Sequence, residues 1–401
     1  MQTREFRAGD STRQEKQSLS HEGGPAGSTR VKLAMVSCGL GNVNRGFEVS
    51  TARWFHALSK QTELDVRLFA GGKYPNSTMI MNIPRDFMLN WVLRAFTPFS
   101  KRRVWEFAYG TEMVTSAVGI LPELIAWNPD VVWTKDAPFG CVLKFFRDIL
   151  GLKFKLALAN GGGFRPRTYK DFDFIQHLQP SSFQMAIAEG IPEAKMQILP
   201  HFAHYFRPQG SRSEVRREFG LADDDFVVVC VSAWNCYHKR IDYLINEVAQ
   251  IDDPKVKLLL CGHPEPDTPQ LKELGRRILR DRIQWFTLPP QGVHKALFAS
   301  DVYVIASVNE VFGAATIEAA LAELPIVCHP NEGTRYILGE HCGSLDLTRE
   351  GVLAKKLSEL RDSYPDATYL RQVRDLVAAR FSEEVLAQKF ASAIISLRQT
   401  S

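Results

Sequence analysis

The sequence predicts an α/β protein made of two doubly wound parallel-sheet domains of similar size. Short apolar runs typical of buried strands alternate with segments of helical spacing, and this pattern starts again after a stretch at 206–213 that is rich in Pro, Gly and Ser. The 401 residues suffice for two domains at roughly 150 residues each. We expect a disordered tail at 1–30, an N-terminal domain at 31–205, a C-terminal domain at 206–382 and a final helix at 383–401. A return of that helix to the first domain stays an open alternative.

The first half reads as strands and helices in alternation. The stretch 31–46 reads as a buried strand that runs into a glycine-rich loop, and further apolar runs predict strands at 64–72, 130–133, 154–164 and 196–202. Residues 47–58 carry a helical apolar stripe, and residues 84–109 are helical in tendency.

The second half repeats this alternation. Ser213 is expected to cap a first helix, and strands are predicted at 225–234, 256–262, 283–286, 301–307 and 325–330. Helices are predicted between these strands, and an amphipathic helix at 383–397 closes the chain. Because ligands of such sheets bind beyond the carboxyl ends of the strands, we expect the site between the two domains.

Composition and charge exclude several classes of protein. A net charge of +4 is too small to indicate nucleic-acid binding, and no apolar run reaches the roughly 18 residues of a membrane span. Seven cysteines without CxxC spacing favour a reducing compartment, so we expect a cytoplasmic protein without zinc or disulfides. The basic and aromatic segment 90–107 favours a core helix with a solvated basic face. Its alternative is peripheral contact with the inner membrane face or with an acceptor.

The stretch Ser307–Pro325 carries the most specific chemistry. Glu310 follows a predicted strand, Gly313 allows close backbone approach, and the helix that starts there suits a phosphate or sugar oxygen. Glu318 lies in a helix that is apolar nearly all round, and a buried carboxylate needs a hydrogen-bond partner such as a ribose diol. Alternatively, Glu318 pairs with an internal arginine or backbone amide, and Glu310 is an ordinary loop carboxylate.

This pair of glutamates, with seven residues between them that include Phe312-Gly313, resembles the donor-site signature of a large family of retaining GT-B glycosyltransferases. This family-4-like group includes sucrose, mannosyl and glucosyl transferases. Further stretches resemble it in the same order, at 39–58, 187–208, 238–245, 257–265 and 325–338, so the resemblance covers residues 31–398. It implies a GT-B fold, in which two Rossmann-like domains face a cleft.

The resemblance also implies roles on the donor side. Glu318 would bind the ribose hydroxyls and Glu310 the transferred sugar, while Lys239 would contact the diphosphate, unless it belongs to a solvated Lys-Arg pair. The backbone of Phe312, Gly313 and Ala314 would face sugar and phosphate. The family's usual upstream arginine is missing, because the sequence there reads Ser232-Ala233-Trp234-Asn235. Trp234, Asn235 or His238 would take its place.

The N-terminal half should supply the acceptor side. Gly39 and Gly41 lie in the first loop, where glycine lets backbone amides approach a phosphate or simply forms a tight turn, and Gly46 ends this loop. Where many family members have a histidine, this chain has Asn160 followed by Gly161. Asp136, at a strand end, is the nearest carboxylate, and its alternative is an Asx turn before Pro138.

The predicted function is therefore transfer of a hexose-type sugar from a nucleotide-diphosphate sugar to a hydroxyl acceptor, with retention of the anomeric configuration. The acceptor is a saccharide, a lipid-linked molecule or a small molecule. No cofactor and no metal are expected, because the acidic runs 171–173 and 223–225 are weak mimics of a DxD site. Two alternatives stay open: a nucleotide-sugar epimerase, and a catalytically degenerate sugar-nucleotide-binding protein.

Overall fold

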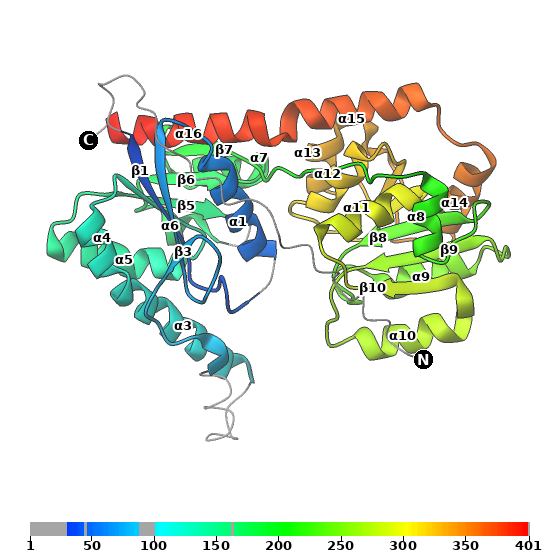
Figure 1. The fold of residues 1–401 in the computed structure, drawn as a ribbon, viewed down its shortest axis with the longest axis horizontal. Helices are drawn as coiled ribbons and strands as arrows, with labels where there is room; N and C mark the ends of the chain where they lie inside the picture. Colours follow the sequence, from blue (N-terminus) through cyan, green and yellow to red (C-terminus); the bar gives the residue numbers. More distant parts are fainter. Residues whose placement is uncertain (1–29, 44–45, 88–100, 162–163, 400–401) are drawn as a thin grey trace.

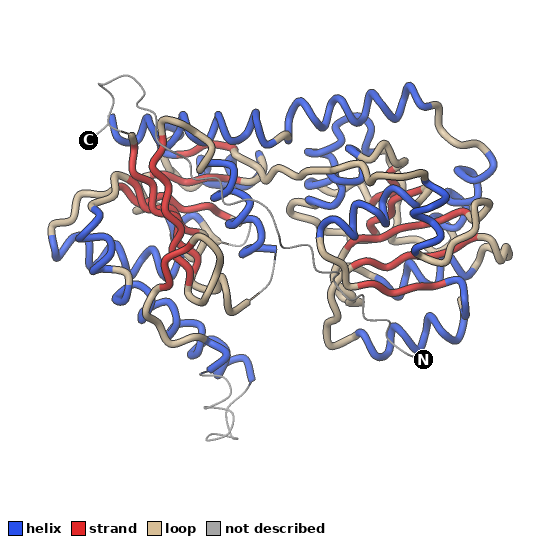
Figure 2. The backbone as a smooth tube through the Cα atoms, viewed as in Figure 1, coloured by secondary structure: helices blue, strands red, loops and turns tan. Residues whose placement is uncertain are grey.

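The computed structural model describes residues 30–43, 46–87, 101–161 and 164–399, and the tail expected at 1–30 lies almost wholly outside them. The described chain contains two parallel sheets, each covered by helices on both faces (Figures 1 and 2). Both sheets begin with a central strand, extend to one side and then return to extend to the other. The predicted α/β class with two doubly wound sheets is confirmed.

The first sheet has seven strands in the order β3-β2-β1-β4-β5-β6-β7, and every pairing is parallel. Its strands are β1 (Val31–Ser37), β2 (Leu64–Ala70), β3 (Ser77–Met79), β4 (Val131–Thr134), β5 (Lys155–Asn160), β6 (Phe174–His177) and β7 (Met196–Ile198). The β1 strand is buried nearly throughout, as expected of a parallel strand covered on both faces.

Helices cover both faces of this sheet. Leu33 and Met35 of β1 belong to an apolar cluster with Trp54, while Ala34 and Val36 belong to a second cluster on the opposite face. The helices of this half are α1 (Gly46–Leu58), α3 (Lys101–Gly119), α4 (Leu121–Trp127), α5 (Ala137–Leu150), α6 (Pro166–Tyr169) and α7 (Pro180–Ala188), with the short η1 (Glu193–Lys195) before β7.

The second sheet has five parallel strands in the order β10-β9-β8-β11-β12. They are β8 (Phe226–Val231), β9 (Val256–Cys261), β10 (Ile283–Phe286), β11 (Val302–Ile305) and β12 (Ile326–Cys328). The helices are α8 (Arg212–Glu218), α9 (Ile241–Ala249), α10 (Thr268–Ile278), α11 (Pro290–Ala299), α12 (Ala314–Leu321), α13 (Glu332–Leu338), α14 (Val352–Asp362) and α15 (Ala367–Phe381), with short η2 (Arg280–Arg282) and η3 (Gly339–Cys342). The expected cap of α8 is wrong: Ser211, not Ser213, caps it through a capping box with Glu214.

The last helix, α16 (Glu383–Gln399), lies against α1, β1 and β4 of the first half (Figure 1). Phe390 meets the Trp54 ring edge to face at 4.8 Å. At its first turn, Glu383 lies 2.6 Å from Lys60 Nζ and 2.6 Å from His204 Nε2. Because α15 belongs to the second half, the chain passes between the halves twice, before α8 and again at Ser382.

Candidate active site

Lys239 and Glu310 meet at the carboxyl edge of the second sheet. Lys239 lies between β8 and α9, Glu310 follows β11, and these two strands are the neighbours between which the chain order reverses. Lys239 Nζ lies 2.5 Å from Glu310 Oε2. Asn235 shapes this loop, since its Oδ1 accepts the backbone N–H groups of His238 at 3.1 Å and Lys239 at 2.7 Å. Three predicted residues therefore gather at the place where ligands of such sheets bind.

The neighbours of Lys239 have separate partners. Arg240 donates to the carbonyl oxygen of Leu347 at 2.6 Å, so the alternative of a simply solvated Lys-Arg pair is wrong. His238 Nε2 lies 3.0 Å from the carbonyl oxygen of Asn309. The side chain of Trp234 is buried in the second half against Trp285, so the structure does not bring it to Lys239.

The start of α12 lies beside this pair. Gly313 occupies the N-cap position and Ala314 is the first helical residue, so backbone N–H groups stand free at this end. The ring of Phe312 packs at the junction of the halves, 5.7 Å from the ring of His201 and 5.9 Å from that of Phe381. The loop thus offers its backbone, while its aromatic side chain is used in packing.

Glu318 makes an ion pair across the two halves. Its side chain on α12 is 9% exposed, and its Oε1 accepts a hydrogen bond of 3.3 Å from Arg53 Nη2 on α1. Burial raises the pKa of Glu318, and Arg53 opposes this shift. The alternative of an arginine partner is therefore realised in this state, and no sequence pattern indicated that Arg53 would be this partner. The bond is long and single, so a better donor can compete for this carboxylate.

The first loop of the N-terminal half is shaped by close packing. Gly41 has φ +88°, and a Cβ there would lie 2.5 Å from the backbone carbon of Gly72. A Cβ on Gly39 would lie 2.6 Å from Glu48 Oε1 and 3.2 Å from Arg85 Nη2. Gly41 is therefore required by a tight turn, which was the alternative interpretation of this loop. Gly39 instead leaves space beside the charged groups of Glu48 and Arg85. Gly46 is the first residue of α1.

Asp136 lies buried at the end of β4, beside β1, where the order of the first sheet reverses. Its side chain makes no capping bond at the start of α5, and it accepts bonds of 3.3 Å from the backbone N–H of Cys38 and from the hydroxyl of Tyr109. The Asx-turn alternative is therefore wrong. Burial raises the pKa of Asp136 to about 6, although Arg85 lowers it in part. Arg85 itself is held by Glu112.

Asn160 and Gly161 lie at the end of β5 on the same sheet edge. Asn160 is buried and makes a hydrogen bond that lowers the pKa of Tyr169, although burial raises that pKa by more. A Cβ on Gly161 would lie 3.5 Å from the ring of Phe47, so this strand end approaches the start of α1.

The comparisons with known proteins agree with this geometry. The family model described as "Glycosyl transferases group 1" matches residues 225–362, which include Lys239, Glu310 and Glu318. Residues 225–362 form a group 1 glycosyltransferase domain. A relative of the same kind is D-inositol 3-phosphate glycosyltransferase of Mycolicibacterium smegmatis, 30% identical over 186 residues, which are 43% of this chain and 41% of that protein. The chain spans half or less of the length of the curated relatives it matches.

Solved structures are similar over nearly the whole chain. Sucrose-phosphate synthase of Thermosynechococcus elongatus has a TM-score of 0.71 at 15% identity, covering 93% of this chain and 100% of that one. Anabaena Alr3699/HepE, solved with UDP and glucose, has a TM-score of 0.66 at 16% identity, covering 92% and 100%. At these identities the likeness shows the fold, which is GT-B, as predicted.

Residues outside the group 1 domain, which the sequence analysis missed, also gather at the junction. Lys135 and Glu48 are buried beside Asp136, and His201 lies near Lys135 and Arg53. Burial lowers the pKa of His201 well below its usual range, and the charges of Lys135 and Arg53 lower it further. The one sequence feature that could have indicated these missed residues is a lysine directly before Asp136, at the end of a predicted strand.

The two acidic runs have structural partners. Asp173 accepts bonds of 2.7 Å from Arg147 and from the backbone N–H of Leu156. Asp224 pairs with Lys255, and Asp225 accepts the backbone N–H of Ala222. Within the described part of the chain, no group of three His, Cys, Asp or Glu residues is arranged to hold a metal ion.

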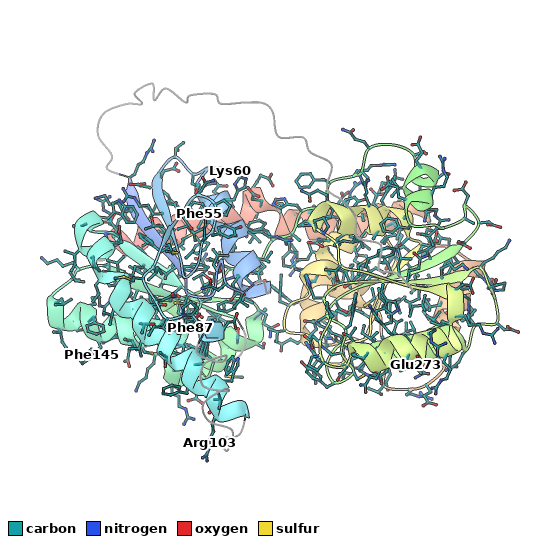
Figure 3. All side chains as sticks on the ribbon, turned by 60° about the horizontal axis from the view of Figure 1, so that its bottom comes forward. Phe55, Lys60, Phe87, Arg103, Phe145 and Glu273 are labelled. Atoms are coloured by element: carbon teal, nitrogen blue, oxygen red, sulfur yellow. The ribbon has the colours of Figure 1, made fainter. Side chains whose placement is uncertain are left out.

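Most of segment 90–107 lies outside the described residues, and the rest belongs to α3. In that helix Val104 is buried, whereas Phe107 is 60% exposed. Phe87 and Phe145 are also exposed on this half (Figure 3). Among the described residues, no helix is both long and apolar enough to span a bilayer.

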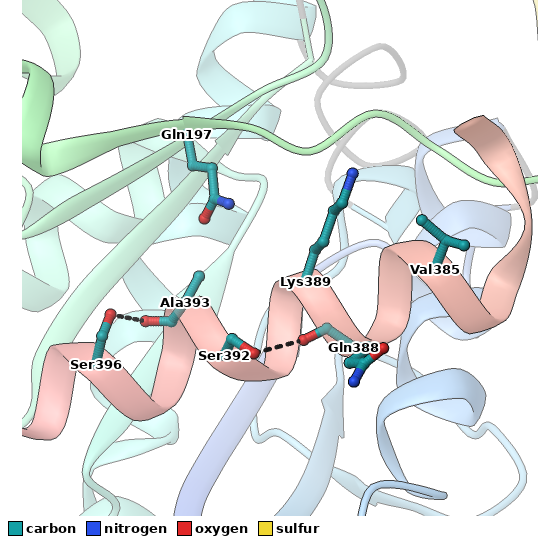
Figure 4. A pocket seen from close by; sticks show the side chains of 7 residues that line it. All are labelled: Gln197, Val385, Gln388, Lys389, Ser392, Ala393 and Ser396. Carbon is teal, nitrogen blue, oxygen red and sulfur yellow. Dashed lines mark hydrogen bonds between the residues drawn. The ribbon is translucent and has the colours of Figure 1, made fainter. Parts of the chain in front are cut away.

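A surface groove of about 490 Å³ lies elsewhere. It runs between Gln197 of β7 and α16, where Lys389, Ser392 and Ser396 line it (Figure 4). The two serines donate to carbonyl oxygens of their own helix. None of the predicted site residues lines this groove, so it does not contribute to the candidate site.

Proposed function

We propose that this protein transfers a hexose-type sugar from a nucleoside-diphosphate sugar to a hydroxyl acceptor, with retention at the anomeric carbon and without a metal ion. The observation that supports it most is the contact between Lys239 and Glu310 in the group 1 domain. This contact lies where the strand order of the second sheet reverses, next to the free N–H groups at the start of α12. The similar Anabaena protein, which was solved with UDP and glucose, supports a nucleotide sugar as the donor.

In this proposal the donor diphosphate takes the position between Lys239 and the start of α12. The ammonium and the helix N-terminus stabilise the negative charge that develops as the diphosphate leaves. Glu310 then contacts the transferred sugar, and Glu318 exchanges its single bond to Arg53 for the two ribose hydroxyls. The acceptor hydroxyl approaches the same face of the sugar from the N-terminal half, so catalysis consists of positioning and charge stabilisation.

Mass spectrometry after incubation with a panel of nucleotide sugars tests this proposal. We expect slow hydrolysis of one donor, with glycoside formation when acceptors are added, and loss of both in Lys239→Met. Interconversion of the donor without acceptor would instead show an epimerase. Donor binding without any turnover would show a binding protein.

A further inference from the structure

Two oppositely charged side chains, Lys135 and Glu48, are buried close together at the carboxyl edge of the first sheet without forming an ion pair. Lys135 is 2% exposed and Glu48 is 5% exposed. Among the described residues, no carboxylate oxygen lies within 4.0 Å of Lys135 Nζ. The ammonium contacts the hydroxyl of Ser50 and the carbonyl oxygen of Phe47, at 3.3 Å for the latter, so one of its three donors is left over. Glu48 Oε2 is buried and accepts no hydrogen bond.

This arrangement is costly for the folded protein alone. An unpaired charge in the interior is destabilising, and a direct ion pair between these neighbours would be the ordinary remedy. Burial lowers the pKa of Lys135 to about 7, while the charges of Glu48 and Asp136 oppose this shift. The two charges therefore act on each other without a direct contact. Gly39 keeps a side chain away from Glu48 Oε1, because a Cβ there would lie only 2.6 Å from that atom.

The opposite charges of Lys135 and Glu48 determine which ligand group could bind to both. A phosphate or carboxylate would suit Lys135 but would be repelled by Glu48, and an ammonium group would meet the opposite conflict. A hydroxyl satisfies both, because it donates to the carboxylate and accepts from the ammonium. We propose that Glu48 and Lys135 form a subsite that binds hydroxyl groups of a sugar or cyclic polyol acceptor. This inference rests on the proposed function and names the acceptor side of the same site.

The position of the subsite fits an acceptor. Lys135 follows β4 and Glu48 lies in the first turn of α1, both at the point where the order of the first sheet reverses. Five residues after Glu48 on the same helix, Arg53 reaches Glu318 in the group 1 domain. The charge of Lys135 also acts on His201, whose ring lies 5.7 Å from that of Phe312 in the donor loop. An acceptor held here lies beside the donor residues of the other half.

The test uses the full chain and the nucleotide sugar that the mass-spectrometry panel identifies as the donor. The four acceptor probes are methyl α-glucoside, methyl α-mannoside, N-acetylglucosamine and myo-inositol. In Glu48→Gln and in Lys135→Met, the acceptor KM should rise roughly tenfold or more, because each change removes a charge-assisted hydrogen bond. The Kd of the nucleoside diphosphate, measured by calorimetry, should change by less than about twofold, since that ligand has no acceptor hydroxyl. Asp224→Asn, which removes the exposed pair with Lys255, is the control and should change neither value.

Thermal unfolding separates a ligand site from a structural pair. If the two charges served stability, the double variant E48Q/K135M would melt below wild type; the subsite predicts that it melts at the same temperature or higher, because two buried charges are removed. An unchanged acceptor KM in both single variants, or an equal loss of diphosphate affinity, overturns the proposal. If wild type turns over no nucleotide sugar, the proposed function fails separately. Saturation-transfer NMR with the four probes then decides: the subsite stands only if a probe bound by wild type is lost in Glu48→Gln.

Discussion

Replacing Glu318 and Glu310 by glutamine should weaken two different steps. Glu318 is nearly buried and is proposed to hold the ribose hydroxyls in the ground state and the transition state alike. The change to glutamine keeps the shape but replaces bonds to a charged acceptor, which are worth about 1.5–3 kcal/mol each, by neutral ones. Since Arg53 contributes one long bond of 3.3 Å in the ligand-free state, little of this loss is recovered there. Affinity for the nucleoside diphosphate should therefore fall roughly 10- to 150-fold.

Glu310→Gln should behave differently. Its carboxylate neutralises Lys239 at 2.5 Å and is proposed to face the transferred sugar, which a nucleoside diphosphate lacks. Calorimetry with the diphosphate should thus show an affinity close to that of wild type, while kcat falls. Glu323→Gln is the matched control, because Glu323 lies just after α12 and pairs with Arg374, away from Lys239.

Three outcomes would refute this reasoning. If Glu310→Gln weakens diphosphate binding as much as Glu318→Gln does, the two roles are assigned wrongly. If Glu323→Gln does the same, the effect comes from α12 as a whole and not from a ligand contact. If neither Glu318→Gln nor Glu310→Gln alters binding or rate, the donor site does not lie here.

Further predictions concern stability and metal. Because burial raises the pKa of Asp136 to about 6, its folded form holds the proton more tightly, so this group stabilises the fold below about pH 4 and the contribution is lost as pH rises to 6. Asp136→Asn should accordingly raise the melting temperature relative to wild type by more at pH 7.5 than at pH 5, which corresponds to a difference of about 1.4 kcal/mol in the free energy of unfolding, and an equal effect at both pH values would contradict the shift. Gly41→Ala should destabilise by about 2–5 kcal/mol in thermal unfolding, since it combines a positive φ with a clash against Gly72, whereas Gly110→Ala on α3, with open space around it, should be neutral or stabilising. Donor hydrolysis should persist in excess EDTA, and a loss restored by manganese would refute metal independence.

The places of the candidate donor residues could be predicted from the sequence, because these residues are local and carry the family resemblance. Glu310, Gly313 and Glu318 lie within nine positions on one strand-loop-helix unit, so the spacing alone fixes their arrangement. Lys239 joins them because β8 and β11 are neighbours in a doubly wound sheet, which the alternation of strands and helices predicts. The misplaced cap of α8 shows the limit of such reading: Ser211 and Ser213 both precede the helix, and only the reciprocal bond to Glu214 distinguishes them.

The buried charges of the candidate acceptor side could not be predicted in this way, because segments far apart in the sequence bring them together. Glu48, Arg85, Glu112 and Lys135 lie on four separate segments, each in a local pattern that an ordinary surface residue would share. Their burial becomes visible only when α1, α3 and the end of β4 meet at the edge of the first sheet. A charged residue in a helix predicts exposure by default, so the exception appears only in the packed structure.

The ion pair between Arg53 and Glu318 joins these two sides physically. It is formed by α1 of one half and by α12 of the group 1 domain, and it engages the carboxylate that the ribose is proposed to use. In the proposed function, the ribose of the nucleotide competes with Arg53 for hydrogen bonds to Glu318. The nucleotide therefore binds with higher affinity to a conformation in which the bond between Arg53 and Glu318 is already broken. By linkage, the nucleotide then favours that conformation by the same factor. Because Arg53 and Glu48 belong to the same helix α1, release of Arg53 gives donor binding a direct route to the subsite proposed there.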